Sequence, residues 1–73
     1  MSPCTARVLT YLKNKANKGV ADVRQRDIMA GADVSYGSTH AALRWLESVG
    51  VVETLRSTID KREVRYRLKR IGS

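Results

Sequence analysis

Three side chains that can donate hydrogen bonds recur every four residues, at Tyr36, His40 and Arg44. Positions four apart share one face of an α-helix. A guanidinium can donate two parallel bonds to a guanine edge or clamp a phosphate, and a phenol or an imidazole can donate to bases or to the backbone. The spacing therefore predicts a short polar helix face suited to binding a polyanion.

A basic segment follows this face. From Arg56 to the end of the sequence, seven Lys and Arg residues stand against two acidic ones, a local net charge of +5. The whole chain of 73 residues carries 14 Lys and Arg against 7 Asp and Glu, a net charge of +7, with a pI near 10.2. The expected partner surface is therefore acidic, and nucleic acid is the commonest such surface.

The sequence holds no recognisable catalytic or metal-binding set. Ser38 and His40 fall on one predicted helix without a third group to orient them, and there is no Gly-rich phosphate loop. The single cysteine, Cys4, cannot form an internal disulfide, and with one histidine it cannot complete a tetrahedral metal site. We expect Cys4 to be a packing residue. We expect no enzyme, no metal, no cofactor and no small-molecule ligand.

Length and hydropathy predict one small intracellular domain over residues 1–73. Hydrophobic residues make up 42% of the chain, and no apolar run is long enough to span a bilayer or to serve as a signal peptide. A domain of this size buries only about 60% of its unfolded surface, so it has one core. The expected location is the cytoplasm or the nucleoid.

The first predicted helix begins at Ser2-Pro3 and ends at Gly19. Serine accepts hydrogen bonds from free amide groups at a helix start, and proline tolerates the first turn. The apolar positions in helical register are Cys4, Val8, Leu9, Leu12 and Ala16. Residues 20–23 then predict a single short extended strand.

Two further helices are predicted before the strands. The second covers residues 24–30, with Ile28 and Met29 facing inward, and residues 31–33 break it because Gly and Asp tolerate turn conformations. The third starts at Ser35 as N-cap and ends at Gly50. Its predicted inner face holds Thr39, Ala42, Leu43, Leu46 and Val49. Its predicted outer face holds Gly37, His40, Ala41, Arg44 and Ser48, with Tyr36 and Trp45 on the flanks.

The last part of the sequence predicts a β-hairpin. Residues 51–56 are rich in β-branched side chains, and residues 57–61 form a polar turn. From residue 63 onward the side chains alternate, with Val64, Tyr66 and Leu68 on one face and Arg65 and Arg67 on the other. The hairpin is therefore expected to have an apolar underside and a basic outside.

This order of elements resembles a winged helix-turn-helix domain. The stretch from Val34 to Val52 is similar to the pattern VSxSTVxxxLxxLExxGLV, which precedes the wing in the multiple-antibiotic-resistance repressor (MarR-like) family of transcriptional regulators. The matching positions are Val34, Ser35, Ser38, Leu43, Leu46, Glu47, Gly50 and Val52. In the wing segment STIDKREVRYRL, Asp60 and Arg62 match the Asp-x-Arg of that family. One departure is Asp33, which stands where the family usually carries glycine.

The resemblance covers about residues 5–68 and implies an α+β fold. Three helices precede a C-terminal β-hairpin wing, with a short strand after the first helix. The resemblance also implies that the third helix enters the major groove of DNA, where residues near its N-terminus reach deepest. The expected partner is therefore double-stranded DNA.

The residues expected to contact DNA come from three elements. The third helix offers Ser35, Tyr36, Gly37, Ser38, His40, Ala41 and Arg44, of which the small Gly37 and Ala41 let the backbone approach closely. The wing offers Arg56, Lys61, Arg62, Arg65 and Arg67, which neutralise phosphates or enter the minor groove at the tip. The start of the second helix offers Arg24, Gln25 and Arg26 to the backbone. These roles require the polar side of the third helix and the basic ribbon to point the same way.

Each candidate also has a plainer interpretation. Without the helix-turn-helix context, His40 is more often an ordinary solvated histidine, and Tyr36 is as often a cover for the edge of the core. Trp45 more often packs than binds. Arg65 and Arg67 can serve only to prevent sheet edges from aggregating, although the same sign recurs at several other positions of the segment.

The leading hypothesis is a small regulator, most simply a repressor, of a prokaryote, an archaeon, or one of their plasmids or viruses. It would bind a specific DNA sequence and act by occupying an operator. The alternatives are an architectural or protein-interaction module of replication or recombination, and an RNA-binding domain. RNA binding ranks last because the aromatic residues are scattered. A homodimer through Tyr11 of the first helix and Trp45 is expected from the two-fold symmetry of many operators.

Overall fold

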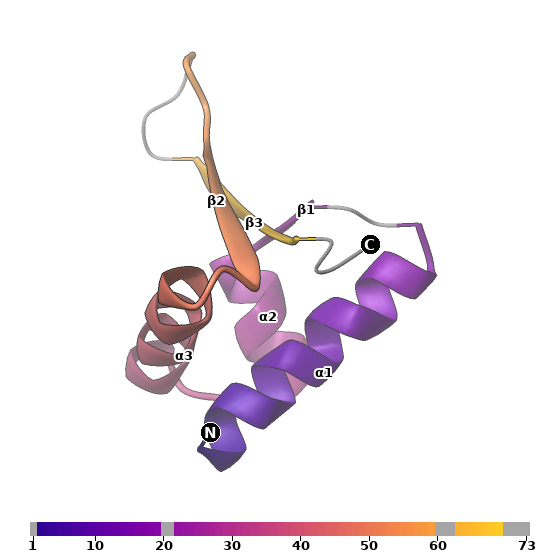
Figure 1. The fold of residues 1–73 in the computed structure, drawn as a ribbon, viewed down its shortest axis with the longest axis vertical. Helices are drawn as coiled ribbons and strands as arrows, with labels where there is room; N and C mark the ends of the chain where they lie inside the picture. The colour runs from indigo at the N-terminus through magenta and orange to yellow at the C-terminus, as the bar shows by residue number, and fades with distance from the viewer. Residues whose placement is uncertain (1, 20–21, 60–62, 70–73) are drawn as a thin grey trace.

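The computed structural model describes residues 2–19, 22–59 and 63–69, which form three helices and a three-stranded sheet. The elements are α1 (Pro3–Asn17), β1 (Asp22–Arg24), α2 (Gln25–Ala32), α3 (Tyr36–Ser48), β2 (Val52–Arg56) and β3 (Val64–Leu68). The helices pack together at the base of the sheet, and the hairpin of β2 and β3 extends away from them (Figure 1). The predicted α+β architecture is therefore confirmed.

Helix α1 starts where the sequence predicts. The Ser2 hydroxyl accepts a hydrogen bond from the Thr5 amide at 3.3 Å, and Pro3 occupies the first turn. Gly19, with a φ of +86°, follows the last turn. The inner face differs from the predicted stripe in two places, because Thr5 is buried and Ala16 is exposed. The side chain of Thr5 is satisfied there by a 2.8 Å hydrogen bond to Ser2, which allows a polar residue in the interface.

Helix α2 is longer than predicted. It continues through Gly31 to Ala32, so the break predicted over residues 31–33 comes at Asp33 and not at Gly31. A side chain at Gly31 would overlap the ring of Tyr11, which means that this glycine permits close contact between α1 and α2. The helix ends at Asp33, which adopts the left-handed conformation with a φ of +55°. Asp33 thus takes over the turn that the MarR-like pattern usually assigns to glycine.

Helix α3 places four residues in the core. Thr39, Ala42, Leu43 and Leu46 are buried, and the Thr39 hydroxyl donates to the Val34 carbonyl at 3.4 Å. Ser35 is the N-cap as predicted, and Gly50 follows the helix with a φ of +80°. Val49 is 52% exposed, so its predicted place on the inner face is wrong. The helix closes at Val49, its C-cap.

The sheet has the order β1-β3-β2, and both pairings are antiparallel. The predicted extended segment at 20–23 appears as β1 at residues 22–24, and residues 20 and 21 lie outside the described part of the chain. The predicted alternation of β3 is confirmed, since Arg65 and Arg67 are exposed while Val64, Tyr66 and Leu68 are partly buried. Val23 and Val52 complete the buried underside of the sheet.

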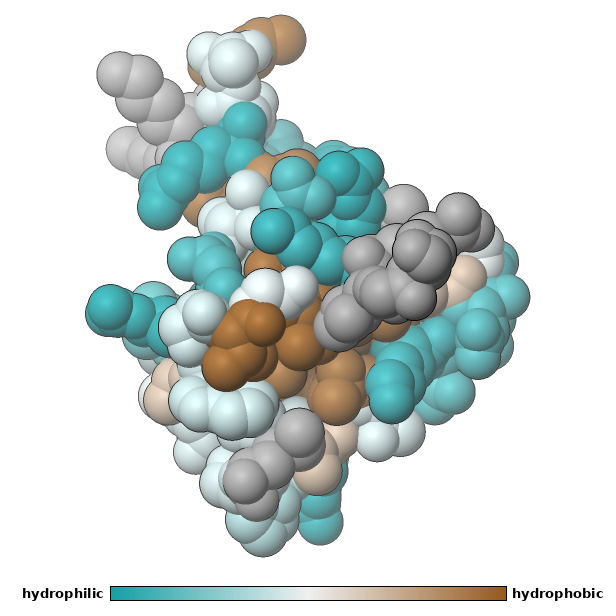
Figure 2. Space-filling model, in the orientation of Figure 1, coloured by the Kyte–Doolittle hydropathy of each residue, from teal (hydrophilic) through white to brown (hydrophobic). Residues whose placement is uncertain are grey.

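The core lies between the three helices and this underside. Its fully buried side chains come from every helix and from β2: Val8, Ile28, Thr39, Leu43, Leu46 and Val52. Figure 2 shows hydrophilic residues over much of the hairpin and of the outer helix surfaces, with hydrophobic surface at the far end of the hairpin and between α1 and α3. Within the described residues, no helix is long and apolar enough to cross a membrane.

Candidate nucleic-acid interface

The outer face of α3 carries small and polar residues, with the exposed Tyr36 and Trp45 on its flanks. Gly37, His40, Ala41, Arg44 and Ser48 are all exposed, as the helical spacing predicts. They are presented rigidly, because the opposite side of the helix is buried against α1 and the sheet. With glycine and alanine near its centre, this surface allows another macromolecule to approach the helix backbone.

A groove of about 480 Å³ separates α3 from the inner face of the hairpin. Its walls come from both elements and from the start of α2: Gln25, Tyr36, His40, Leu43, Arg44, Glu47, Thr54, Arg56, Val64 and Tyr66. The β2–β3 register places Thr54 beside Tyr66 and Arg56 beside Val64 on this inner face. The groove therefore joins the polar side of α3 to one side of the wing.

Aromatic side chains line the mouth of this groove. The rings of Tyr36 and His40 lie parallel, with centroids 6.2 Å apart, and Tyr36 is 65% exposed. Burial, together with the nearby Glu47 carboxylate, raises the pKa of Tyr66 above its usual value near 10. Its phenol therefore keeps its proton at neutral pH and remains a hydrogen-bond donor.

The acidic residue in the groove is anchored to the wing. The Thr54 hydroxyl of β2 donates a hydrogen bond to the Glu47 carboxylate of α3. This bond ties the helix to the hairpin within the groove. Arg44 and Arg56 provide the cationic groups of its lining.

Gln25 supplies an unpaired donor. Its side-chain nitrogen Nε2 is buried, and it is the buried side-chain polar atom without a hydrogen-bond partner in the described part of the chain. Such an atom costs free energy in the isolated protein. The residue sits at the first position of α2 and lines the same groove, so a bound polar group could satisfy it.

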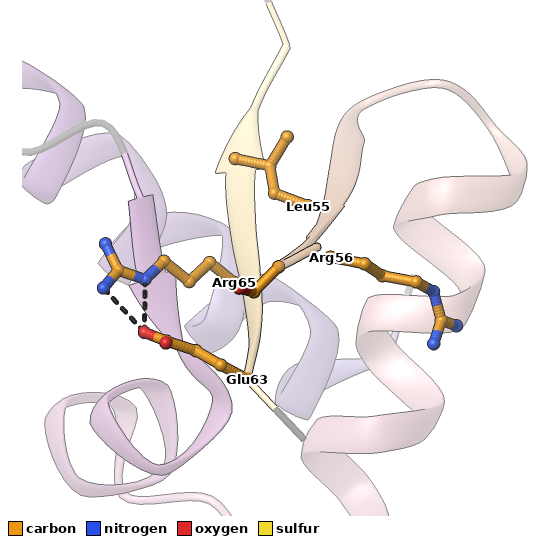
Figure 3. A pocket seen from close by; sticks show the side chains of 5 residues that line it. Leu55, Arg56, Glu63 and Arg65 are labelled. Atoms are coloured by element: carbon orange, nitrogen blue, oxygen red, sulfur yellow. Dashed lines mark hydrogen bonds and ion pairs between the residues drawn. The ribbon is translucent and has the colours of Figure 1, made fainter. Parts of the chain in front are cut away.

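The outer face of the sheet has a different character. Arg65 donates to the Glu63 carboxylate through Nη2 at 2.7 Å and Nε at 3.0 Å, and Arg24 donates to the same oxygen at 2.9 Å. Arg65 also lies 3.9 Å from the carboxylate of Asp22. Figure 3 shows Arg65 turned toward Glu63 on one side of the hairpin, while Arg56 extends to the other side, toward α3.

Arg67 completes this outer face by donating to the Glu53 carboxylate at 2.8 Å. Hydrogen bonds from Arg65 and then Arg24 lower the pKa of Glu63, and the bond from Arg67 lowers the pKa of Glu53. The carboxylates therefore remain charged at neutral pH. The strands of this face carry three arginines and three carboxylates, whose formal charges balance: Arg24, Arg65 and Arg67 against Asp22, Glu53 and Glu63. Lys69 follows β3 close enough to act on Glu53.

The structure thus brings together only some of the predicted site residues. Gln25, Tyr36, His40, Arg44 and Arg56 line one groove. The expectation that the whole basic ribbon points the same way as α3 is corrected, because strand alternation turns Arg65 and Arg67 to the opposite face. Arg24 also lies on that outer face, where it is paired with Glu63, whereas its neighbour Gln25 lines the groove.

The other predicted residues that the structure describes do not line this groove. Gly37 is exposed on the outer side of α3, Arg26 is exposed on α2, and Ser35 is exposed without a capping hydrogen bond from its side chain. Ser38 and Ala41 border a hollow of about 490 Å³ between α3 and the start of α1, next to Trp45. The matching wing residues Asp60, Lys61 and Arg62 lie outside the described residues.

Glu47, Thr54 and Tyr66 belong to the groove but were not predicted as site residues. The signal for two of them is the strand alternation itself, which puts Thr54 on the same face as Arg56 and pairs it with Tyr66. Tyr11 was predicted as a dimer contact, but its ring already packs within the chain. Tyr11 packs against Gly31 within the same chain, with the Lys15 ammonium 5.6 Å from the ring centre.

No protein-family model and no curated protein sequence matches this chain. Solved structures match it closely in shape. BpsR of Bordetella bronchiseptica, described with the regulation of its DNA binding by 6-hydroxynicotinic acid, aligns over 94% of this chain with a TM-score of 0.82 at 13% identity. The chain has the winged helix-turn-helix fold. Its wing is the hairpin of β2 and β3, and its helix-turn-helix is α2 and α3.

Two further winged helix-turn-helix structures cover the same share of the chain. The adhesin competence repressor AdcR of Streptococcus pyogenes has a TM-score of 0.73 at 14% identity. FabT of Streptococcus pneumoniae, solved in complex with DNA, has a TM-score of 0.69 at 24% identity. BpsR and FabT are thus described with DNA and AdcR as a repressor, and the predicted resemblance to MarR-family transcriptional regulators is confirmed in fold. The chain spans about half the length of each, 48%, 47% and 45%.

Proposed function

We propose that this winged helix-turn-helix binds a specific sequence of double-stranded DNA and regulates transcription, as a repressor, by occupying an operator. The observation that carries the proposal is the groove that Arg44 of α3 and Arg56 of β2 both line, together with polar side chains. The exposed side of α3 enters the major groove, and the inner face of the wing lies against the adjoining backbone.

In this proposal, the small residues of α3 allow close approach to DNA, and its polar and charged residues contact the bases. Gly37 and Ala41 are small and exposed, so the helix backbone comes close to the floor of the major groove. Arg44 donates two bonds to guanine, and His40, held parallel to Tyr36, donates to a base or a phosphate. A good bidentate contact discriminates against the wrong base by about 1–3 kcal/mol.

The phosphates are held from both sides of the groove. Arg56 reaches the backbone from β2, and the amide of Gln25, whose buried Nε2 lacks a partner, turns into the groove to donate to a phosphate from the start of α2. Arg26 is exposed beside it on the first turn. With Arg44 used on guanine, neutralising the two phosphates at Arg26 and Arg56 gives a log–log salt slope of about −1.8. The wing tip adds to this value.

The test is to select bound sequences from a pool of random duplexes and to measure affinity for the best duplex at several salt concentrations. We expect a defined site and about tenfold to 100-fold weaker binding in Arg44→Ala, following from the loss of a bidentate contact. Arg7→Ala removes an exposed arginine of α1 far from the groove and is the matched control. Equal affinity for all duplexes, unchanged in Arg44→Ala, would favour the architectural function, and a flat salt response would reject DNA binding.

A homodimer on a two-fold operator is part of the same proposal, because one short helix reads few base pairs. Trp45 is the better candidate for the contact, since its ring is 44% exposed whereas Tyr11 is used against Gly31. The measurement is the molar mass at micromolar concentration, together with the emission of Trp45 on dilution. A monomer mass with unshifted emission would contradict the dimer.

A further inference from the structure

The end of the wing carries an exposed hydrophobic side chain. Ile59 is 97% exposed, more than Tyr36, Val49 or Trp45, the other large hydrophobic residues on the described surface. It lies beyond the last strand residue of β2, where hydrophobic surface is visible at the far end of the hairpin (Figure 2). Packing within the chain does not account for it, because almost none of its surface is covered.

Turn chemistry does not account for Ile59 either. Hairpin turns favour Gly, Asn, Asp, Ser and Pro, and a β-branched residue gains stability mainly by packing in a strand. The Ser57 hydroxyl accepts the Ile59 amide at 3.2 Å, so the backbone here is shaped by a serine turn while the isoleucine side chain is left in water. A residue that breaks the local preferences without a structural gain is typical of a functional position.

The length of the wing can be compared with the spacing of the grooves of DNA. The five residues of β2, at about 3.3 Å each, span about 17 Å. One turn of DNA is about 34–36 Å, so neighbouring major and minor grooves are about 17 Å apart along the helix axis. Ile59 lies three residues beyond β2, so with α3 in the major groove the wing is long enough for Ile59 to reach the flanking minor groove.

We propose that Ile59 is an apolar wedge that enters this minor groove and opens a base step. The inference rests on the proposed DNA-binding function and adds its second recognition element. Apolar side chains that enter the minor groove partly unstack a step and bend the duplex. Pyrimidine–purine steps deform most easily. Ile59 therefore selects such a step about 5 base pairs from the centre of the α3 contact, at about 3.4 Å per base pair.

The experiment compares the full chain with Ile59→Ser, Ile59→Leu and Val49→Ser on the selected duplex. Affinity is measured by titration, and bending by energy transfer between dyes at the duplex ends. Ile59→Leu keeps an apolar side chain at the tip, while Val49→Ser removes an exposed apolar side chain at the end of α3. A thermal melt checks each variant, and the full exposure of Ile59 means that its loss should leave the melting temperature unchanged.

We expect Ile59→Ser to bind about tenfold more weakly, as burial of one aliphatic side chain implies. It should also lose the bend and the preference for the flanking step, while it keeps the sequence read by α3. Ile59→Leu and Val49→Ser should behave as the unaltered chain. Unchanged affinity, bend and step preference in Ile59→Ser, with binding still lost in Arg44→Ala, would overturn the wedge and leave the proposed function standing. If the unaltered chain selects no duplex, both fail together.

Discussion

Arg56 and Arg65 offer a direct test of which face of the wing meets DNA. The two arginines lie on neighbouring strands, one register position apart, and extend to opposite sides of the hairpin (Figure 3). Arg56 lines the groove beside α3, whereas Arg65 is bound to Glu63 and lies near Asp22. Replacing each by alanine removes the same charge from the two faces, so each variant is the control of the other.

The expected magnitude follows from the number of phosphates that each arginine neutralises. One phosphate contributes about 0.9 to the log–log salt slope, so Arg56→Ala should flatten the slope by about that amount. Between 50 and 200 mM salt, the affinity of the unaltered chain should then fall about 3.5-fold more than that of Arg56→Ala. For Arg65→Ala the slope should stay unchanged, because its guanidinium is already neutralised by carboxylates within the chain.

The assay is a fluorescence anisotropy titration of a labelled duplex at four or more salt concentrations. A random duplex of equal length gives the nonspecific slope. The reasoning would be refuted if Arg65→Ala flattened the slope as much as Arg56→Ala, since the outer face would then contact phosphates despite its ion pairs. A slope unchanged in both variants would refute the role of Arg56 instead.

Three further predictions concern stability as well as binding. Gln25→Met should stabilise the free protein by about 1 kcal/mol, because it removes a buried donor without a partner. The same variant should bind the duplex more weakly. A melting temperature that does not rise contradicts the predicted stabilisation. Gly31→Ala should destabilise by about 1–3 kcal/mol through overlap with the ring of Tyr11, and Tyr11→Leu in the same chain should recover most of the loss in a denaturant titration. The folded-state pKa values of Glu53 and Glu63 are lowered, so their contribution to stability is complete above the ordinary carboxylate pKa near 4.5. It is lost as the pH falls through the lowered folded-state pKa values. The melting temperature of the double variant Glu53→Gln with Glu63→Gln should therefore depend less on acid pH.

The helices and the hairpin could be predicted because their signals are local. Ser2-Pro3 and Gly19 bound α1, and the alternation from residue 63 onward gives the two faces of β3. Gly31 shows where local signals fail. Its residue type indicates a break, but its role is to let the ring of Tyr11 approach α2, and that contact joins residues 20 positions apart. A glycine required for a close approach cannot be distinguished from a glycine required for a turn without knowing the packing.

The candidate site was predicted on α3 and only partly on the wing, for a related reason. Helical spacing was sufficient to identify the exposed side with His40 and Arg44. For the wing, the sign of the charge was visible, but the partners of each charge were not. Arg24 meets Glu63 across 39 positions and Arg67 meets Glu53 across 14. Only the folded arrangement of the strands shows that these arginines are already paired with carboxylates of the same chain.

The paired charges of the outer face have a consequence for specificity. Nonspecific DNA binding follows the number of phosphates that a protein neutralises and carries no sequence information. A wing with free arginines on both faces would hold any duplex in more than one orientation. Pairing Arg65 and Arg67 with Glu63 and Glu53 leaves the free cation of the described wing strands, Arg56, on the side of α3. The wing can then add affinity only in the orientation in which α3 also reads the bases. Glu63→Gln should therefore raise affinity for random duplexes more than for the selected one, and an equal rise for both would contradict this link between charge pairing and specificity.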